Sequence, residues 1–68
     1  MNIKEKFGKK IKTLRINASL SQEKLALEAD IDRTYIADIE KGERNVSLVT
    51  VEKLANVLGK DVYNYYKE

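Results

Sequence analysis

Apolar side chains recur along this chain at helical spacing, in segments separated by polar breaks. Phe7, Ile11 and Leu14 fall at i, i+4 and i+7, which predicts a helix over about residues 3–17 with one inward face. Strong helix formers abound and proline is absent, so we expect a nearly all-α fold. The other expected helices span about residues 22–28, 33–41 and 48–58, with a short fifth helix starting near Asp61.

Segment 21–40 is interpreted as two short helices joined by a tight turn. Ser21 and Asp32 precede the two helices as candidate N-caps, whose side-chain oxygens can accept hydrogen bonds from unpaired backbone N–H groups. Each helix carries a short apolar stripe, so the two can share one buried corner. Two short helices in this arrangement form a helix-turn-helix, which we place at residues 22–41.

The chain resembles the phage-repressor (lambda-repressor-like, Cro/CI-type) family of DNA-binding proteins from Phe7 to about Tyr66. Segment 33–48, RTYIADIEKGERNVSL, looks especially like controller proteins of restriction-modification systems, which regulate their own operon. The resemblance implies a single five-helix, all-α domain over residues 1–68. The matching positions are Leu14-Arg15, Leu20-Ser21-Gln22, Leu25-Ala26, Ile31, Ile36, Ile39-Glu40, Gly42 and Leu54-Ala55.

Charge is distributed unevenly, although the net charge of the 68 residues is only +2. Residues 1–20 carry six basic side chains and one acidic side chain, whereas residues 21–48 carry four basic and seven acidic. Such asymmetry hints at a polyanionic partner. The alternative is a solvated basic helix face.

Composition excludes several function classes. The chain has no cysteine and no histidine, which removes disulfides, thiolate metal sites and the commonest metal ligand and general base. No apolar run approaches the ~20 residues of a membrane span, and no signal-peptide pattern opens the chain. No nucleophile–base pair stands out. We therefore expect a soluble cytoplasmic protein that is not an enzyme, with no metal, cofactor, membrane or small-molecule ligand.

A recognition helix presents its N-terminal side chains to base edges in the major groove. Arg33 can contact guanine O6 and N7 with two hydrogen bonds, Thr34 can donate or accept, and Tyr35 can reach a base or a phosphate. The resemblance implies that Arg33, Thr34 and Asp38 face the bases. Asp38 is unusual there, because a carboxylate near DNA is repelled. It either accepts from cytosine N4, orients a neighbouring donor, or weakens binding.

Four further residues are predicted to contact phosphates. Gln22 opens the second helix, where the helix N-terminus itself favours an anion. The resemblance implies a backbone contact for Gln22, and the alternative is an exposed polar residue. Arg44, Asn45 and Ser47 follow the recognition helix and can bind phosphates through side chains and N–H groups.

Three positions concern how the helices are held together. Arg15 either contacts phosphate or pairs with Glu40, and the resemblance favours the ion pair because the family pairs the matching residues. Gly8 lies inside a helix, where it costs about 1 kcal/mol relative to alanine, which suggests close approach of a neighbouring helix or of the DNA backbone. Asp30 stands where the family usually has a left-handed glycine, and aspartate tolerates that conformation better than most residues.

We expect a homodimer on double-stranded DNA, joined through the last two helices. The helix over residues 48–58 has more apolar positions than one inward stripe requires, namely Leu48, Val49, Val51, Val57 and Leu58, although Val51 and Leu58 also fall on the inward stripe. Tyr63 and Tyr65 are of a type enriched at interfaces. The alternative is that the C-terminal tyrosines only cover the core of a monomer.

The functional prediction is a sequence-specific transcriptional regulator of a pseudo-palindromic operator, with a restriction-modification controller as the specific case. The alternative is a protein-binding module such as an antitoxin. An antitoxin normally needs an additional toxin-binding segment, and only two residues follow Tyr66 in this sequence.

Overall fold

The computed structural model describes residues 2–67, with side chains described for residues 2–65. This part of the chain contains helices and no strands, which confirms the five-helix, all-α prediction. The helices are α1 (Ile3–Asn17), α2 (Gln22–Ala29), α3 (Arg33–Glu40), α4 (Leu48–Leu58) and α5 (Asp61–Lys67).

Polar side chains fix where the helices begin. The N-cap side chains of Ser21, Asp32 and Ser47 each accept from a backbone N–H two or three residues further on, at 3.0, 2.7 and 3.2 Å. Asn2 and Glu5 cap α1 reciprocally, each side chain accepting from the other residue's backbone N–H. These bonds satisfy donors that the first helical turn leaves unpaired. The N-caps predicted at Ser21 and Asp32 are therefore present.

Two helix ends differ by one residue from the prediction. Helix α2 continues to Ala29, and α3 ends at Glu40, because Lys41 forms the C-cap and Gly42 follows it with φ of 77°. Asp30, between α2 and α3, has φ of 56° and ψ of 50°, the left-handed conformation expected there.

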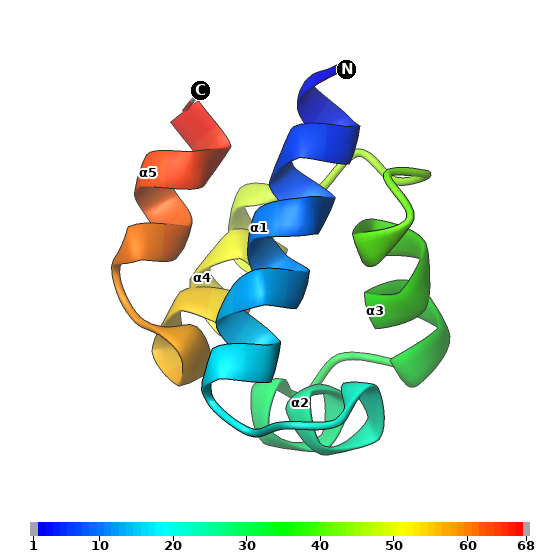
Figure 1. Cartoon of the computed structure of the whole chain (residues 1–68), viewed down its shortest axis with the longest axis vertical. Helices are drawn as coiled ribbons and strands as arrows, with labels where there is room; N and C mark the ends of the chain where they lie inside the picture. The colour runs from blue at the N-terminus through cyan, green and yellow to red at the C-terminus, as the bar shows by residue number, and fades with distance from the viewer. Residues whose placement is uncertain (1, 68) are drawn as a thin grey trace.

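Helix α1 crosses the molecule between α3 and α5, while α2 packs on α3 and α4, and α4 packs on α5 (Figure 1). One apolar core lies between them. Because α1 and α2 both pack on α3, the position of α3 is determined by two neighbours. The buried core residues are Phe7, Ile11, Leu25, Ala26, Ala29, Ile36, Ile39, Val51, Leu54, Ala55 and Val62.

Helices α1 and α3 lie very close together at Gly8. A Cβ atom at this position would overlap the backbone carbonyl oxygen of Ile39. Gly42, which follows α3, lies against Glu5 of α1. A Cβ atom would therefore be too close to a neighbour at either glycine. The close approach of a neighbouring helix at Gly8 is therefore present, and it brings α1 into direct contact with the backbone of α3.

The structure corrects one residue of the predicted dimer surface. Val51 is completely buried in the core of its own chain, so it has no surface to offer a second copy. It belongs to the inward stripe of α4, with Leu54 one turn later. Leu48 and Val49, in the first turn of α4, remain 71% and 62% exposed. Tyr63 is also exposed, and Tyr65 is half-buried with the Lys10 ammonium 5.0 Å from its ring centre.

Among residues 2–67, none of the helices combines the length and the apolar character that crossing a bilayer requires. The same part of the chain contains no group of three or more acidic side chains that could hold a metal ion.

Candidate nucleic-acid interface

The first turn of α3 presents two polar side chains to solvent. Arg33 and Thr34 are both exposed, directly after the Asp32 cap that fixes where the helix starts. Among the side chains of residues 2–65, Arg33 has no ion-pair partner, so its guanidinium is available to a ligand. Both residues lie where a recognition helix meets base edges.

Tyr35, Asp38 and Arg44 form a second feature, which we call the Arg44 cluster. Arg44 Nε lies 3.2 Å from Asp38 Oδ2, and the guanidinium carbon lies 5.0 Å from the centre of the Tyr35 ring. The Arg44 side chain is 50% exposed and that of Asp38 is 23% exposed. Asp38 was predicted to face the bases. In this structure its carboxylate accepts a hydrogen bond from Arg44, which agrees with the alternative that Asp38 orients a neighbouring donor. The base contact itself stays a prediction.

Glu40 is the centre of a buried polar group, which we call the Glu40 node. Arg15 Nε donates to Glu40 Oε2 at 2.7 Å, and Arg15 Nη2 donates to Oε1 at 3.1 Å. A third guanidinium nitrogen, Nη1, donates to the carbonyl oxygen of Leu20 at 2.8 Å. The two charged side chains are only 11% and 4% exposed. The predicted ion pair is thus present, with the two-bond geometry that makes arginine–carboxylate pairs strong.

Gln22 joins the same node. Its side-chain Nε2 donates to Glu40 Oε1 at 3.1 Å, so the residue that opens α2 is tied to the end of α3. This bond was not predicted. An amide nitrogen has two hydrogens and the amide oxygen is an acceptor, so the side chain retains bonding capacity. A phosphate contact by Gln22 therefore stays a prediction, made from a side chain that is already oriented.

Asn45 and Ser47 lie beyond α3 and are both exposed. The Ser47 hydroxyl caps α4 and also donates to Thr50 Oγ1 at 3.1 Å, so its proton is used within the chain. A phosphate contact at Ser47 would have to use the backbone N–H. Asn45 has no such internal role among the hydrogen bonds of the described residues.

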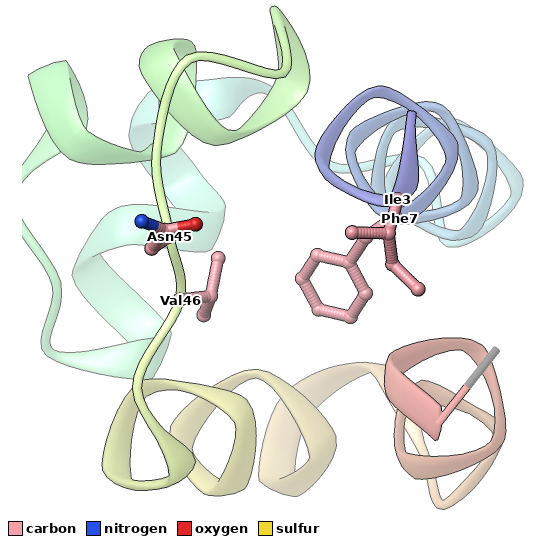
Figure 2. A pocket seen from close by; sticks show the side chains of 4 residues that line it. All are labelled: Ile3, Phe7, Asn45 and Val46. Carbon is pink, nitrogen blue, oxygen red and sulfur yellow. The ribbon is translucent and has the colours of Figure 1, made fainter. Parts of the chain in front are cut away.

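A surface hollow of about 460 Å³ separates the loop after α3 from the start of α1. Its lining residues are Ile3 and Phe7 on α1, and Asn45 and Val46 on the loop. Val46 and Phe7 project toward each other across it (Figure 2). The lining is mostly apolar and brings no set of charged groups together, so we assign it no part in the DNA interface.

Sequence reasoning missed two contacts that shape this surface. Lys53 on α4 donates from Nζ to the carbonyl oxygen of Asp30 at 3.1 Å, and so holds the turn between α2 and α3. The packing of Arg44 over Tyr35 was also unexpected. Neither pair follows a helical period, since one spans separate helices and the other crosses the chain reversal at Gly42. For the contact of Lys53, the sequence offers one general signal: basic side chains often bind the unpaired carbonyl groups at the C-terminal end of a helix.

Comparison with known proteins places these features in context. The helix-turn-helix family profile HTH_3 matches residues 11–63. The chain is 54% identical over 59 residues to Control protein C.BamHI of Bacillus amyloliquefaciens, covering 85% of this chain and 73% of that protein. It is 52% identical over 59 residues to Control protein C.MunI of Mycoplasma sp, covering 85% and 80% of the two chains.

A solved structure is similar as well. The restriction-modification controller protein C.AhdI from Aeromonas hydrophila superposes with a TM-score of 0.85 at 42% sequence identity. The match covers 91% of this chain and 94% of that chain. The likeness therefore extends over the whole fold, beyond the helix-turn-helix alone.

Proposed function

This chain belongs to the Cro/CI-type helix-turn-helix family HTH_3, and we propose that it is a DNA-binding transcriptional regulator that controls a restriction-modification operon. The observation that carries the proposal is the similarity to control proteins along nearly the whole chain, including the recognition helix. The exposed side chains in the first turn of α3 supply the chemistry that such a regulator needs.

In the proposed complex, α3 lies in the major groove. Arg33 donates two hydrogen bonds to a guanine, which is worth about 1–3 kcal/mol of discrimination against another base. Thr34 contacts the adjoining base. Gln22, Arg44 and Asn45 bind phosphates on either side of the groove and so set the register of α3 on the duplex. Affinity falls steeply as salt rises, because each phosphate contact releases counterions.

We also propose that the active species is a homodimer with two-fold symmetry. One recognition helix covers only a few base pairs, too few to specify a site against competing genomic DNA. Two copies would place two recognition helices about 34 Å apart, one turn of DNA, on a pseudo-palindromic operator. Leu48, Val49 and Tyr63 support this proposal, because they are apolar or aromatic, exposed, and carried by helices other than α3.

The DNA-binding proposal is tested by selecting bound duplexes from a random pool and sequencing them. We expect a pseudo-palindrome. In a repeated selection, Arg33→Ala should lose the preference at one base pair of each half-site and keep the others. Lys60→Ala is the matched control, because it removes the same charge from an exposed position in the turn between α4 and α5. A parent protein that enriches no sequence would refute the proposal.

Assembly is tested separately by sedimentation at micromolar concentration. We expect a dimer that Leu48→Asp weakens. Leu27→Asp is the control, because Leu27 lies on α2, is 74% exposed, and is outside the proposed interface. A single species near the monomer mass of 7.8 kDa, even on operator DNA, would refute the dimer.

A further inference from the structure

The Arg44 cluster poses a question that the proposed function does not answer. Asp38 puts a negative charge on the helix that would meet DNA, where phosphate repels it. Its carboxylate lies 3.2 Å from Arg44 Nε, and the Tyr35 ring centre lies 5.0 Å from the guanidinium carbon. Two different groups therefore fix one arginine, one at its edge and one at its face.

We propose that Asp38 is a positioning residue that holds Arg44 ready to bind an operator phosphate, and so raises specificity for the operator over other DNA. This inference rests on the proposed function. It assigns Asp38 no contact with DNA, and assigns the phosphate contact to Arg44 in the orientation that the cluster gives it.

The geometry leaves the working end of Arg44 accessible. Asp38 takes the Nε–H, which lies on the side-chain edge of the guanidinium. The terminal nitrogens carry the remaining donors, which match a phosphate in a fork-like arrangement. The Arg44 side chain is 50% exposed, so a ligand can reach it without breaking the pair.

Holding the side chain in advance favours the site where it fits. A free arginine loses rotamer freedom when a ligand fixes it, and a preorganised one loses less. Phosphate contacts determine register, so a fixed Arg44 strengthens binding where α3 is correctly seated on its bases. On other sequences the register is not determined and the fixed orientation brings little benefit. Asp38 also cancels one positive charge, which weakens attraction to DNA in general.

The three roles for Asp38 predict different results for Asp38→Asn, which keeps the shape and removes the charge. If Asp38 only weakens DNA binding, Asp38→Asn should bind all DNA more tightly. A base-contacting residue predicts an altered preference at one base pair. A positioning residue predicts weaker binding to the operator, while binding to a scrambled duplex stays equal or becomes tighter.

The test measures dissociation constants for the selected operator and for a scrambled duplex of equal length. We expect Asp38→Asn to weaken operator binding about tenfold, the scale of one lost interaction at such an interface. In the Arg44→Ala background, Asp38→Asn should not weaken operator binding further. Glu43→Gln is the matched control, because it removes an equal exposed charge beside Arg44 and outside the cluster. It should not weaken operator binding.

Nuclear magnetic resonance provides a readout without DNA. A guanidinium held over the Tyr35 ring should show ring-current shifts at the Arg44 Hδ protons. Tyr35→Phe keeps the ring and should keep these shifts, whereas Tyr35→Leu and Asp38→Asn should lose them. Thermal unfolding of each variant shows whether it is folded at the temperature of the binding assay.

The positioning role is overturned if Asp38→Asn tightens binding to both duplexes alike, if it changes the preference at one base pair only, or if Glu43→Gln reproduces its effect. It is also overturned if the ring-current shifts persist in Asp38→Asn. If the parent protein selects no operator, the proposed function is refuted. If the parent binds its operator specifically and Asp38→Asn binds it equally well, only the positioning role is refuted.

Discussion

Arginine–carboxylate pairs tie α3 to other segments in two places, and the two pairs are built differently. In the Glu40 node, Arg15 makes two bonds to one carboxylate and a third to a backbone carbonyl, and both charged side chains are at least 89% buried. In the Arg44 cluster, one bond of 3.2 Å joins the pair, and half of the arginine side chain faces solvent.

The difference separates a contact that maintains the fold from one suited to a ligand. A buried charge that loses its partner cannot be solvated, so each member of the Glu40 node depends on the other. An exposed pair can exchange its partner for water at little cost. Arg44 is therefore accessible to a ligand, whereas Arg15 joins α1 to α3 and to the loop that carries Leu20.

The largest effect is expected from breaking the Glu40 node. Arg15→Ala leaves the Glu40 carboxylate buried beside Gln22 alone, and removing one partner of a buried pair costs about 3–5 kcal/mol. The free energy of unfolding, measured by urea denaturation, should fall by this amount. A domain of about 60 residues has little stability to spare, so the variant should be largely unfolded at room temperature.

A double variant checks the cause of that loss. Arg15→Met combined with Glu40→Leu removes both charges and keeps apolar volume, and such replacements are often neutral or stabilising. We expect the double variant to be more stable than either single one. Equal losses in the single and double variants would show that packing, and not a stranded charge, explains the effect.

A smaller loss is expected at the neighbouring crossing of α1 and α3. Gly8→Ala gains helix propensity, but its Cβ overlaps the backbone carbonyl oxygen of Ile39, which cannot rotate away. Overpacking of this kind costs about 1–3 kcal/mol, so the urea midpoint should fall. Lys9→Ala, at the exposed neighbouring position on α1, is the control and should leave the midpoint nearly unchanged. A stabilised Gly8→Ala variant would contradict the close approach.

The sequence alone predicted most of the fold, because the longer helices carry apolar stripes of clear period and α2, α3 and α4 each begin after a polar cap. Ser21, Asp32 and Ser47 are local signals, each acting within three residues of its own position. Val51 shows the limit of such reasoning. The apolar pattern places Val51 both on the inward stripe and on the predicted dimer surface. The packed structure decides between these roles, because Val51 is fully buried while Leu48 and Val49 are exposed.

The candidate site was predicted less completely than the fold. Composition and resemblance indicated that Asp38 and Arg44 lie near DNA, but nothing in their spacing indicated that they pair with each other. That contact depends on the chain reversal at Gly42, where φ is 77°. Gln22 likewise joins Glu40 across 18 positions of sequence. Contacts between distant segments follow from packing, which a helical pattern does not encode.

The smallest effect is expected from breaking the Arg44 cluster, and it decides whether the comparison between the two pairs holds. Exposed ion pairs contribute about 0.2–1 kcal/mol. An exposed cation over an aromatic ring adds about 0.5–1 kcal/mol. Asp38→Asn should therefore lower the free energy of unfolding by about 1 kcal/mol or less, and Arg44→Ala, which loses both interactions, by about 2 kcal/mol or less. Their coupling in a double-mutant cycle should be about 1 kcal/mol or less and shrink at high salt.

The cycle on Arg15 and Glu40, run in parallel, should give the larger coupling, and that coupling should be less sensitive to salt because the pair is shielded from solvent ions. A coupling above about 2 kcal/mol between Asp38 and Arg44 would exceed what an exposed pair supplies. In that case both pairs maintain the fold, and any loss of operator binding in Asp38→Asn would follow from a damaged α3. A small coupling leaves the orientation of Arg44 as the explanation for a change in DNA binding.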